Sequence, residues 1–470
     1  MADQSITKLT VAGLAERIAS KQLSPVDVAE AYIERIDALE PKLNAFITPT
    51  PDRARAAAKQ AETDIQAGNY KGPLHGIPVA LKDLYWTKGV RTTSGSAITS
   101  DFVPGEDATV VAKLQDAGAY SIGKTGMVEY AYGGFEHNDM FGEPKNPWNV
   151  EHLTGGSSSG SGAAVAASQA PLALGTDTAG SVRGPASYCG LSGLKPTYGL
   201  VSKFGVSVLS YSLDHVGPMA HTAEDVAIAM NAMVGFDARD PNSADHELED
   251  YVAQLRTDTK GLRIGLLGDD FIWKVVHPEV EDAFTAAMRE MESQGAAVEE
   301  VTLGDVEQLA TAQNAITIAE ANAYHSDRIR SQPELFNPAV RRKIEMGFFL
   351  PASAYVKALR IRALFERKFT SLFETFDLLA VPTTHIPAPK FGQKMVLSGK
   401  GEIPAAESVR ITRLFNANGL PAISVPCGFS DEGMPIGLQL VGKRFADGLV
   451  IGAAHAYQQA TDWHTRRPEL

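Results

Sequence analysis

Residues 155–185 read GGSSSGSGAAVAASQAPLALGTDTAGSVRGP. A loop of glycine and serine leads into an alanine-rich helix, and a short apolar strand near 172–175 runs into a second turn of small residues. Small residues let a loop approach other backbone closely. The stretch therefore predicts a loop–helix–strand–turn unit that carries one serine on each loop, Ser157 and Ser181.

Apolar runs and helical patterns alternate on both sides of this stretch, which is typical of an α/β protein. Strands are expected at 75–81, 119–122, 261–267, 297–303, 378–382, 422–426 and 435–441. Helices are expected over much of 1–65 and at 109–118, 278–294 and 305–375. We expect one domain over 1–470, with a strand–helix–strand subdomain at 260–305.

Charge and composition restrict the class of protein. The 470 residues include 43 Lys and Arg against 56 Asp and Glu, a formal charge of −13, which argues against nucleic acid or an anionic membrane as the main partner. Cys189 and Cys427 lie far apart and suit a reducing compartment. The sequence shows no signal peptide and no long apolar run, so we expect a cytoplasmic protein.

Two familiar patterns occur in the wrong context. Residues 118–125 fit a phosphate-binding loop, but the pattern contains its strand instead of following one. Residues 156–160 fit the serine elbow of Ser-His-Asp hydrolases, but no histidine lies in a distinctive loop. The eleven histidines show no paired spacing for metal, so neither a metal nor a cofactor is expected.

A third segment, GIPVALKD at 76–83, places Lys82 at the end of an apolar strand. Together with GGSSSGS at 155–161 and GTDTAGSVRGP at 175–185, it resembles the amidase signature enzymes, and the 24-residue spacing of the two serines also matches. Ser159 and Ala179 stand where that family usually has glycine. The resemblance implies a central mixed, twisted sheet covered by helices on both faces, with a signature core at 65–220.

The resemblance also implies a mechanism. Ser181 would attack an amide carbonyl and form an acyl-enzyme, while Ser157 would pass the proton to a neutral Lys82. The peptide bond before Ser157 would be cis. Backbone N–H groups would form the oxyanion hole, and three side chains would support the loops. The oxyanion donors are Thr178, Ala179, Gly180 and Ser181; the supporting residues are Ser158, Asp177 and Arg183.

The family includes free-standing amidases and the catalytic component of tRNA-dependent glutamyl/aspartyl amidotransferases, their A subunit. In the latter an aspartate is expected to hold the glutamine amino group, and a gap-free alignment back from Gly419 places Val409 there. We therefore expect a free-standing amidase that hydrolyses a small-molecule carboxamide or anilide, with esters and carbamates as side substrates. The amidotransferase component is the alternative, and a catalytically inactive assembly subunit is a further one.

The substrate pocket is expected to be apolar or aromatic. Its candidate residues are Met127, Tyr130, Tyr132, Phe348 and Thr384. We expect a small-molecule amide as the partner, without nucleic acid or membrane. Oligomeric state is not readable from the sequence, and a homodimer is the working hypothesis.

Overall fold

The computed structural model describes residues 3–398 and 401–470. Helix α2 (Pro25–Leu43) shows how local sequence shapes its outer layer. Ser24 Oγ accepts the N–H of Val26 at 3.0 Å and Pro25 occupies the first turn, a favoured helix start. The helix ends at Asn44, whose φ of 50° lies in the left-handed region.

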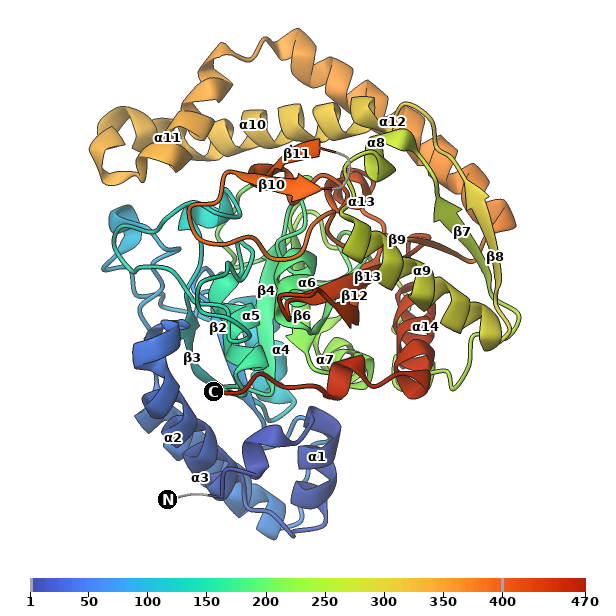
Figure 1. The fold of residues 1–470 in the computed structure, drawn as a ribbon. Helices are drawn as coiled ribbons and strands as arrows, with labels where there is room; N and C mark the ends of the chain where they lie inside the picture. The colour runs from blue at the N-terminus through green and yellow to red at the C-terminus, as the bar shows by residue number, and fades with distance from the viewer. Residues whose placement is uncertain (1–2, 399–400) are drawn as a thin grey trace.

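An eleven-stranded mixed sheet runs through the molecule (Figure 1). In spatial order its strands are β1 (Phe46–Pro49), β3 (Tyr120–Thr125), β2 (Pro78–Lys82), β4 (Leu172–Asp177), β6 (His215–Ala220), β5 (Ser192–Lys195), β12 (Ala422–Phe429), β13 (Pro435–Gly442), β9 (Leu378–Pro382), β7 (Arg263–Leu267) and β8 (Ala297–Val301). A separate hairpin pairs β10 (Met395–Ser398) with β11 (Gly401–Pro404).

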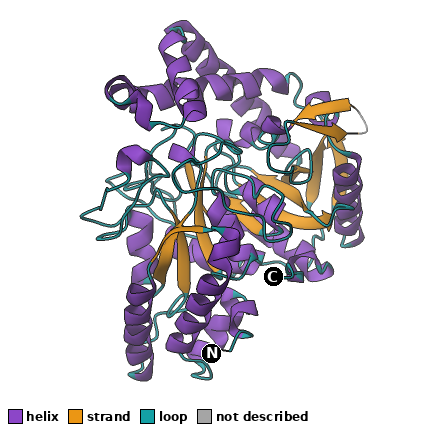
Figure 2. Cartoon of the chain, turned by 60° about the vertical axis from the view of Figure 1, so that its left-hand side comes forward, coloured by secondary structure: helices purple, strands orange, loops and turns teal. Residues whose placement is uncertain are grey.

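Helices flank the sheet, whose strands cross the middle of the molecule (Figure 2). The α-helices are α1 (Val11–Ala19), α2, α3 (Pro51–Gln66), α4 (Thr109–Asp116), α5 (Ser159–Ala166), α6 (Arg183–Cys189), α7 (Ala223–Met233), α8 (Asp270–Trp273), α9 (Pro278–Ser293), α10 (Val306–Ser331), α11 (Pro338–Glu345), α12 (Ala352–Thr375), α13 (Arg413–Ala417) and α14 (Asp447–Ala460). The fold is thus a single large α/β domain with a mixed central sheet, as expected. No described helix is long and apolar enough to span a bilayer.

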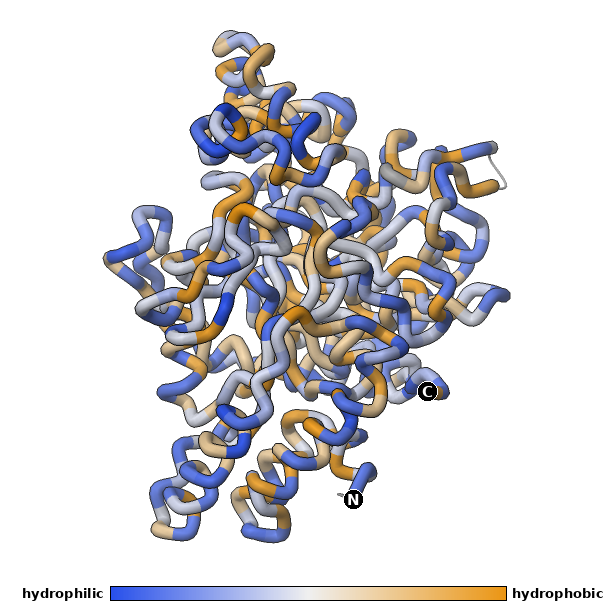
Figure 3. The backbone as a smooth tube through the Cα atoms, turned by 90° about the vertical axis from the view of Figure 1, so that its left-hand side faces the viewer, coloured by the Kyte–Doolittle hydropathy of each residue, from blue (hydrophilic) through white to orange (hydrophobic). Residues whose placement is uncertain are grey.

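Burial differs between the inner and the outlying helices. Every residue of α5 is buried, because its small side chains let the helix pack tightly beside β4 and α6. Hydrophilic and hydrophobic residues instead alternate along the outlying helices near the N-terminus (Figure 3). Strands β7 and β8, which flank α9 in the sequence, extend the same sheet next to β9.

The register of β2 and β4 positions the candidate site. These strands are parallel neighbours with Leu81 opposite Leu174, so the following residues, Lys82 and Gly175, emerge at the same edge of the sheet. The loop that carries Ser157 leads into α5, which packs against both strands. The side chain of Lys82 thereby contacts those of Ser157 and Thr176, which lie 75 and 94 residues further along the chain.

Candidate active site

Lys82 is fully buried at the end of β2. Its Nζ lies 2.7 Å from Ser157 Oγ and 2.8 Å from Thr176 Oγ1. Burial lowers the pKa of Lys82 to about 7, against the opposing effect of the Asp214 and Asp177 carboxylates. A substantial fraction of the amine is therefore neutral near neutral pH and able to accept a proton.

The loop that carries Ser157 passes very close to other backbone. The peptide bond between Gly156 and Ser157 is cis. A Cβ on Gly156 would lie 2.7 Å from the carbonyl oxygen of Gly134, so a larger residue does not fit there. Next to it, Ser158 Oγ donates to the Thr176 carbonyl at 3.2 Å and joins this loop to β4.

Ser181 lies in the turn that follows β4, and three carbonyls of that turn are held from outside. Each accepts a hydrogen bond from a side chain of α10 or of the segment around α13: Asp177 from Asn416, Thr178 from Gln313 and Ala179 from Thr412. In a trans peptide unit the N–H points opposite to its C=O. The N–H groups of Ala179 and Gly180 are therefore turned away from Gln313 and Thr412, and neither meets an acceptor among the described residues.

A buried ion pair underlies the same turn. Arg183 Nη2 lies 2.9 Å and its Nε 3.0 Å from the two carboxylate oxygens of Asp177. Although burial disfavours the charged carboxylate, Arg183 holds the pKa of Asp177 well below its usual range. Asp177 also accepts the backbone N–H of Val182 at 3.1 Å. The pair thus ties the end of β4 to the start of α6 on both sides of Ser181.

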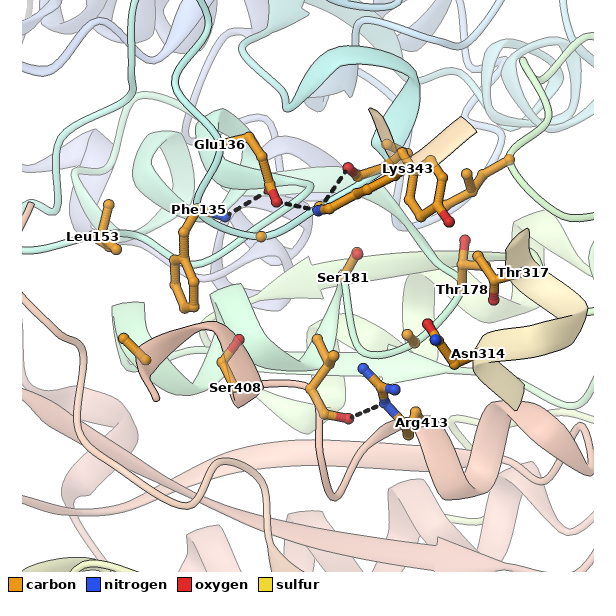
Figure 4. A pocket seen from close by; sticks show the side chains of 18 of the residues that line it. Phe135, Glu136, Leu153, Thr178, Ser181, Asn314, Thr317, Lys343, Ser408 and Arg413 are labelled. Atoms are coloured by element: carbon orange, nitrogen blue, oxygen red, sulfur yellow. Dashed lines mark hydrogen bonds and ion pairs between the residues drawn. The ribbon is translucent and has the colours of Figure 1, made fainter. Parts of the chain in front are cut away.

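A cavity of about 660 Å³ opens at Ser181. The Ser181 hydroxyl points into it and forms no hydrogen bond with another described residue (Figure 4). The lining is more polar than the sequence led us to expect. Its polar and charged side chains include Glu136, Glu143, Gln313, Asn314, Lys343, Ser408 and Arg413.

Of the five residues expected in the substrate pocket, Tyr132 lines this cavity. Met127 and Tyr130 are buried in the core beneath it, and Thr384 is buried elsewhere with its hydroxyl bonded within its own turn. Phe348 is 39% exposed on a 3-10 turn and does not face the cavity. These four placements correct the prediction. Met127, Tyr130 and Thr384 are buried without lining the cavity, and Phe348 lies on the surface.

The charged lining residues were missed because they come from segments far apart in sequence. Lys343 on α11 pairs with Glu136 from the loop after β3, and Arg413 begins α13. Val409 also lines the cavity, whereas the nearby Glu407 pairs with Arg410. The stretch 407–413 contains two arginines, Arg410 and Arg413, and the sequence alone does not show that only the second of them lines the cavity.

The chain belongs to the amidase family, whose model matches residues 27–451. It is thus an enzyme of the class that acts on carbon–nitrogen bonds. It is 40% identical, over 98% of this chain and 99% of the relative, to the A subunit of glutamyl-tRNA(Gln) amidotransferase from Carboxydothermus hydrogenoformans. The corresponding protein of Pseudomonas putida is 41% identical, with 98% and 99% coverage.

Solved structures of related proteins share the fold of this chain. One, described as an unexpected vestigial protein complex that reveals the evolutionary origins of an s-triazine catabolic enzyme, has a TM-score of 0.93 at 35% identity, over 98% of this chain and 100% of that one. The A subunit of the Thermotoga maritima glutamyl-tRNA(Gln) amidotransferase has a TM-score of 0.79 at 33% identity, over 97% and 95%.

These relatives overturn two expectations. The prediction of a free-standing amidase for a small-molecule carboxamide or anilide was wrong, because near full-length relatives are components of an amidotransferase. The expectation of a small-molecule partner without nucleic acid was wrong for the same reason, since those relatives are named for a tRNA. The first expectation gave the valine at position 409 more weight than one residue of a long shared sequence can carry, and the second relied on the formal charge of −13.

Proposed function

We propose that this chain is the catalytic A subunit of a tRNA-dependent glutamyl/aspartyl amidotransferase. In this role it hydrolyses the side-chain amide of glutamine and supplies ammonia for the amidation of a misacylated tRNA. The observation that carries the proposal is the Lys82–Ser157 hydrogen bond, in a chain that has a cavity at Ser181 and is 40% identical to such proteins over 98% of its length.

The residues of the site account for the first half of the reaction. Ser181 Oγ attacks the amide carbon, while Ser157 takes the serine proton and passes its own to the neutral amine of Lys82. The carbon–nitrogen bond then breaks, and the proton returns through Ser157 to the departing ammonia. The glutamyl group stays on Ser181 as an ester, which water cleaves to release glutamate and free the serine.

The turn before Ser181 supplies electrostatic stabilisation. As the carbonyl carbon becomes tetrahedral, its oxygen gains negative charge that N–H groups of Thr178, Ala179, Gly180 and Ser181 stabilise. One such donor is typically worth ~3–4 kcal/mol of the activation barrier. The donors are fixed in advance, because Gln313 and Thr412 hold the opposite, carbonyl side of the turn.

Ser158, Asp177 and Arg183 support this arrangement without touching the substrate. Ser158 joins the Ser157 loop to β4, and the Asp177–Arg183 pair fixes the Ser181 turn. We place the reaction in the cytoplasm, where tRNA is aminoacylated. The two buried, unpaired cysteines, Cys189 and Cys427, fit the reducing conditions there.

The proposal is tested by assembling the chain with its companion proteins from the same source and supplying L-glutamine with glutamyl-tRNA or aspartyl-tRNA. We expect ammonia release and amidated tRNA from the wild-type complex, and neither from a complex with Ser181→Ala. Hydrolysis of simple amides by a complex that never cleaves glutamine would contradict the proposal. So would tRNA amidation that survives Ser181→Ala with glutamine as the sole nitrogen source.

A further inference from the structure

Arg413 is a cation that faces the cavity without an anionic partner among the described residues. It is partly buried at the start of α13 and lines the same cavity as Ser181. Its Nε donates to the Val409 carbonyl at 3.3 Å, and this is the one hydrogen bond of the guanidinium to a described residue. The close-up shows the guanidinium projecting into the cavity on the side of Ser181 (Figure 4).

Lys394 also lines the cavity, but it is exposed to solvent. The remaining charged groups of the lining have partners. Lys343 contacts the carboxylate of Glu136. Glu143 lies 2.8 Å from His137 Nδ1. Glu407, the acidic residue close to Arg413 in sequence, is in contact with Arg410 instead. Arg413 is therefore the partly buried lining cation whose charge no described carboxylate contacts.

The positive charge of Arg413, which no described carboxylate contacts, favours the binding of an anion in the cavity. A guanidinium stays protonated in proteins, so a buried arginine remains charged. Burial lowers the pKa of Arg413 against the opposing effect of the nearby Glu407 carboxylate, which means that its surroundings still disfavour the cation. The two terminal nitrogens form a planar fork that matches the two oxygens of a carboxylate. A phosphate would fit the same fork, but a carboxylate is the anion that glutamine carries.

We propose that Arg413 binds a carboxylate of the amide substrate, and that in glutamine this group is the α-carboxylate. The inference rests on the proposed function for the identity of the substrate, but not for the chemistry of the contact. Val409 offers no charge to the α-ammonium, and the lining carboxylates Glu136 and Glu143 are already engaged. Recognition therefore depends on the carboxylate end, and an ω-amide acid without an amino group should bind as well as glutamine.

Binding to Ser181→Ala protein separates recognition from turnover. Calorimetry would compare glutaramate, which is glutamine without its amino group, with pentanamide, which has the same chain length and no carboxylate. We expect glutaramate to bind about ten- to a hundredfold more tightly, the range for a hydrogen-bonded charged group. The double variant Ser181→Ala/Arg413→Gln should bind both amides with similar affinity.

A matched control removes the same charge three residues earlier. In Ser181→Ala/Arg410→Gln the lost guanidinium had bonded to Glu407 and to the Phe271 carbonyl, outside the cavity lining, so the preference for glutaramate should remain. An equal preference in the Arg413→Gln protein, or no preference in the parent, would overturn the inference. If the wild-type complex does not hydrolyse glutamine but the preference depends on Arg413, the proposed function fails and the carboxylate contact stands.

Discussion

Lys82 Nζ lies 2.7 Å from Ser157 Oγ, although the two residues are 75 positions apart in the chain. A second hydroxyl, Thr176 Oγ1, lies 2.8 Å from the same nitrogen. Neither neighbour is a carboxylate, so burial dominates the pKa of the lysine. This is the environment that a lysine needs in order to act as a base.

Replacing Lys82 with methionine should remove the base while filling nearly the same space. We expect kcat/KM for amide hydrolysis to fall by about 10³-fold or more, as for other residues that act as a catalytic unit. Thr176→Val removes only one hydrogen bond of the amine and should cost much less. Thermal melting of both variants would show whether the fold is intact. A Lys82→Met protein that folds and keeps its activity would contradict the assigned role.

The activity should depend on pH with a rising limb near neutrality. Lys82 accepts a proton only when neutral, and its pKa is lowered to about 7. The neutral fraction, and with it kcat/KM, should therefore be small below about pH 6 and level off above about pH 8. A kcat/KM profile from about pH 5 to about pH 9 checks this. Constant activity across that whole range would mean that a group of lower pKa is the base.

Gly180 should not tolerate alanine. Its φ is 137°, and an added Cβ would overlap the hydroxyl of Thr412, which itself holds the Ala179 carbonyl. We expect Gly180→Ala to lower the free energy of unfolding by about 1–3 kcal/mol and to reduce kcat by at least about tenfold through a displaced oxyanion donor. The matched control is Gly184→Ala, where nothing lies within 4 Å of the new Cβ. Equal effects of the two changes would disprove the steric explanation.

The Asp177–Arg183 pair should contribute strongly to stability. Both side chains are fully buried, and removing one partner of such a pair typically costs about 3–5 kcal/mol because the other charge is left unpaired. We expect this loss for Arg183→Met in urea unfolding. The exposed pair of Arg263 and Asp377 is the comparison, and Arg263→Met should cost under about 1 kcal/mol. Similar losses for the two variants would show that burial of the pair is not what matters.

The Asp177–Arg183 pair should also make the stability of the fold decrease at acidic pH. The pKa of Asp177 is depressed in the folded protein, so its contribution is present above about pH 4 and is lost as the pH falls further. Unfolding experiments at about pH 6 and about pH 3 should show the difference between wild type and Asp177→Asn shrinking at the lower pH. A difference that stays constant would show that the carboxylate charge does not matter.

Much of the architecture follows from local pattern. Alternating apolar runs and helical spacing located β2, β4, β7, β8, β12 and β13, since these strands are bounded by glycine, proline or turns. The strand β6 (His215–Ala220) was not foreseen, because Gly217 and Pro218 within it are typical of a turn. Its pairing with β4 over six residues outweighs that local preference.

The α/β class and the family could be predicted from the sequence alone, which also named Lys82, Ser157 and Ser181 as the candidate catalytic side chains. Those residues stand in short motifs whose spacing is local, and a local pattern can be read directly. The polarity and charge of the cavity lining, by contrast, depend on the tertiary structure. Its lining comes from the loop after β3 and from α10, α11 and α13, whose order in the chain says nothing of which side chains face one another. Arg413, Lys343 and Glu136 line one cavity through long-range packing, which a local sequence pattern does not reveal.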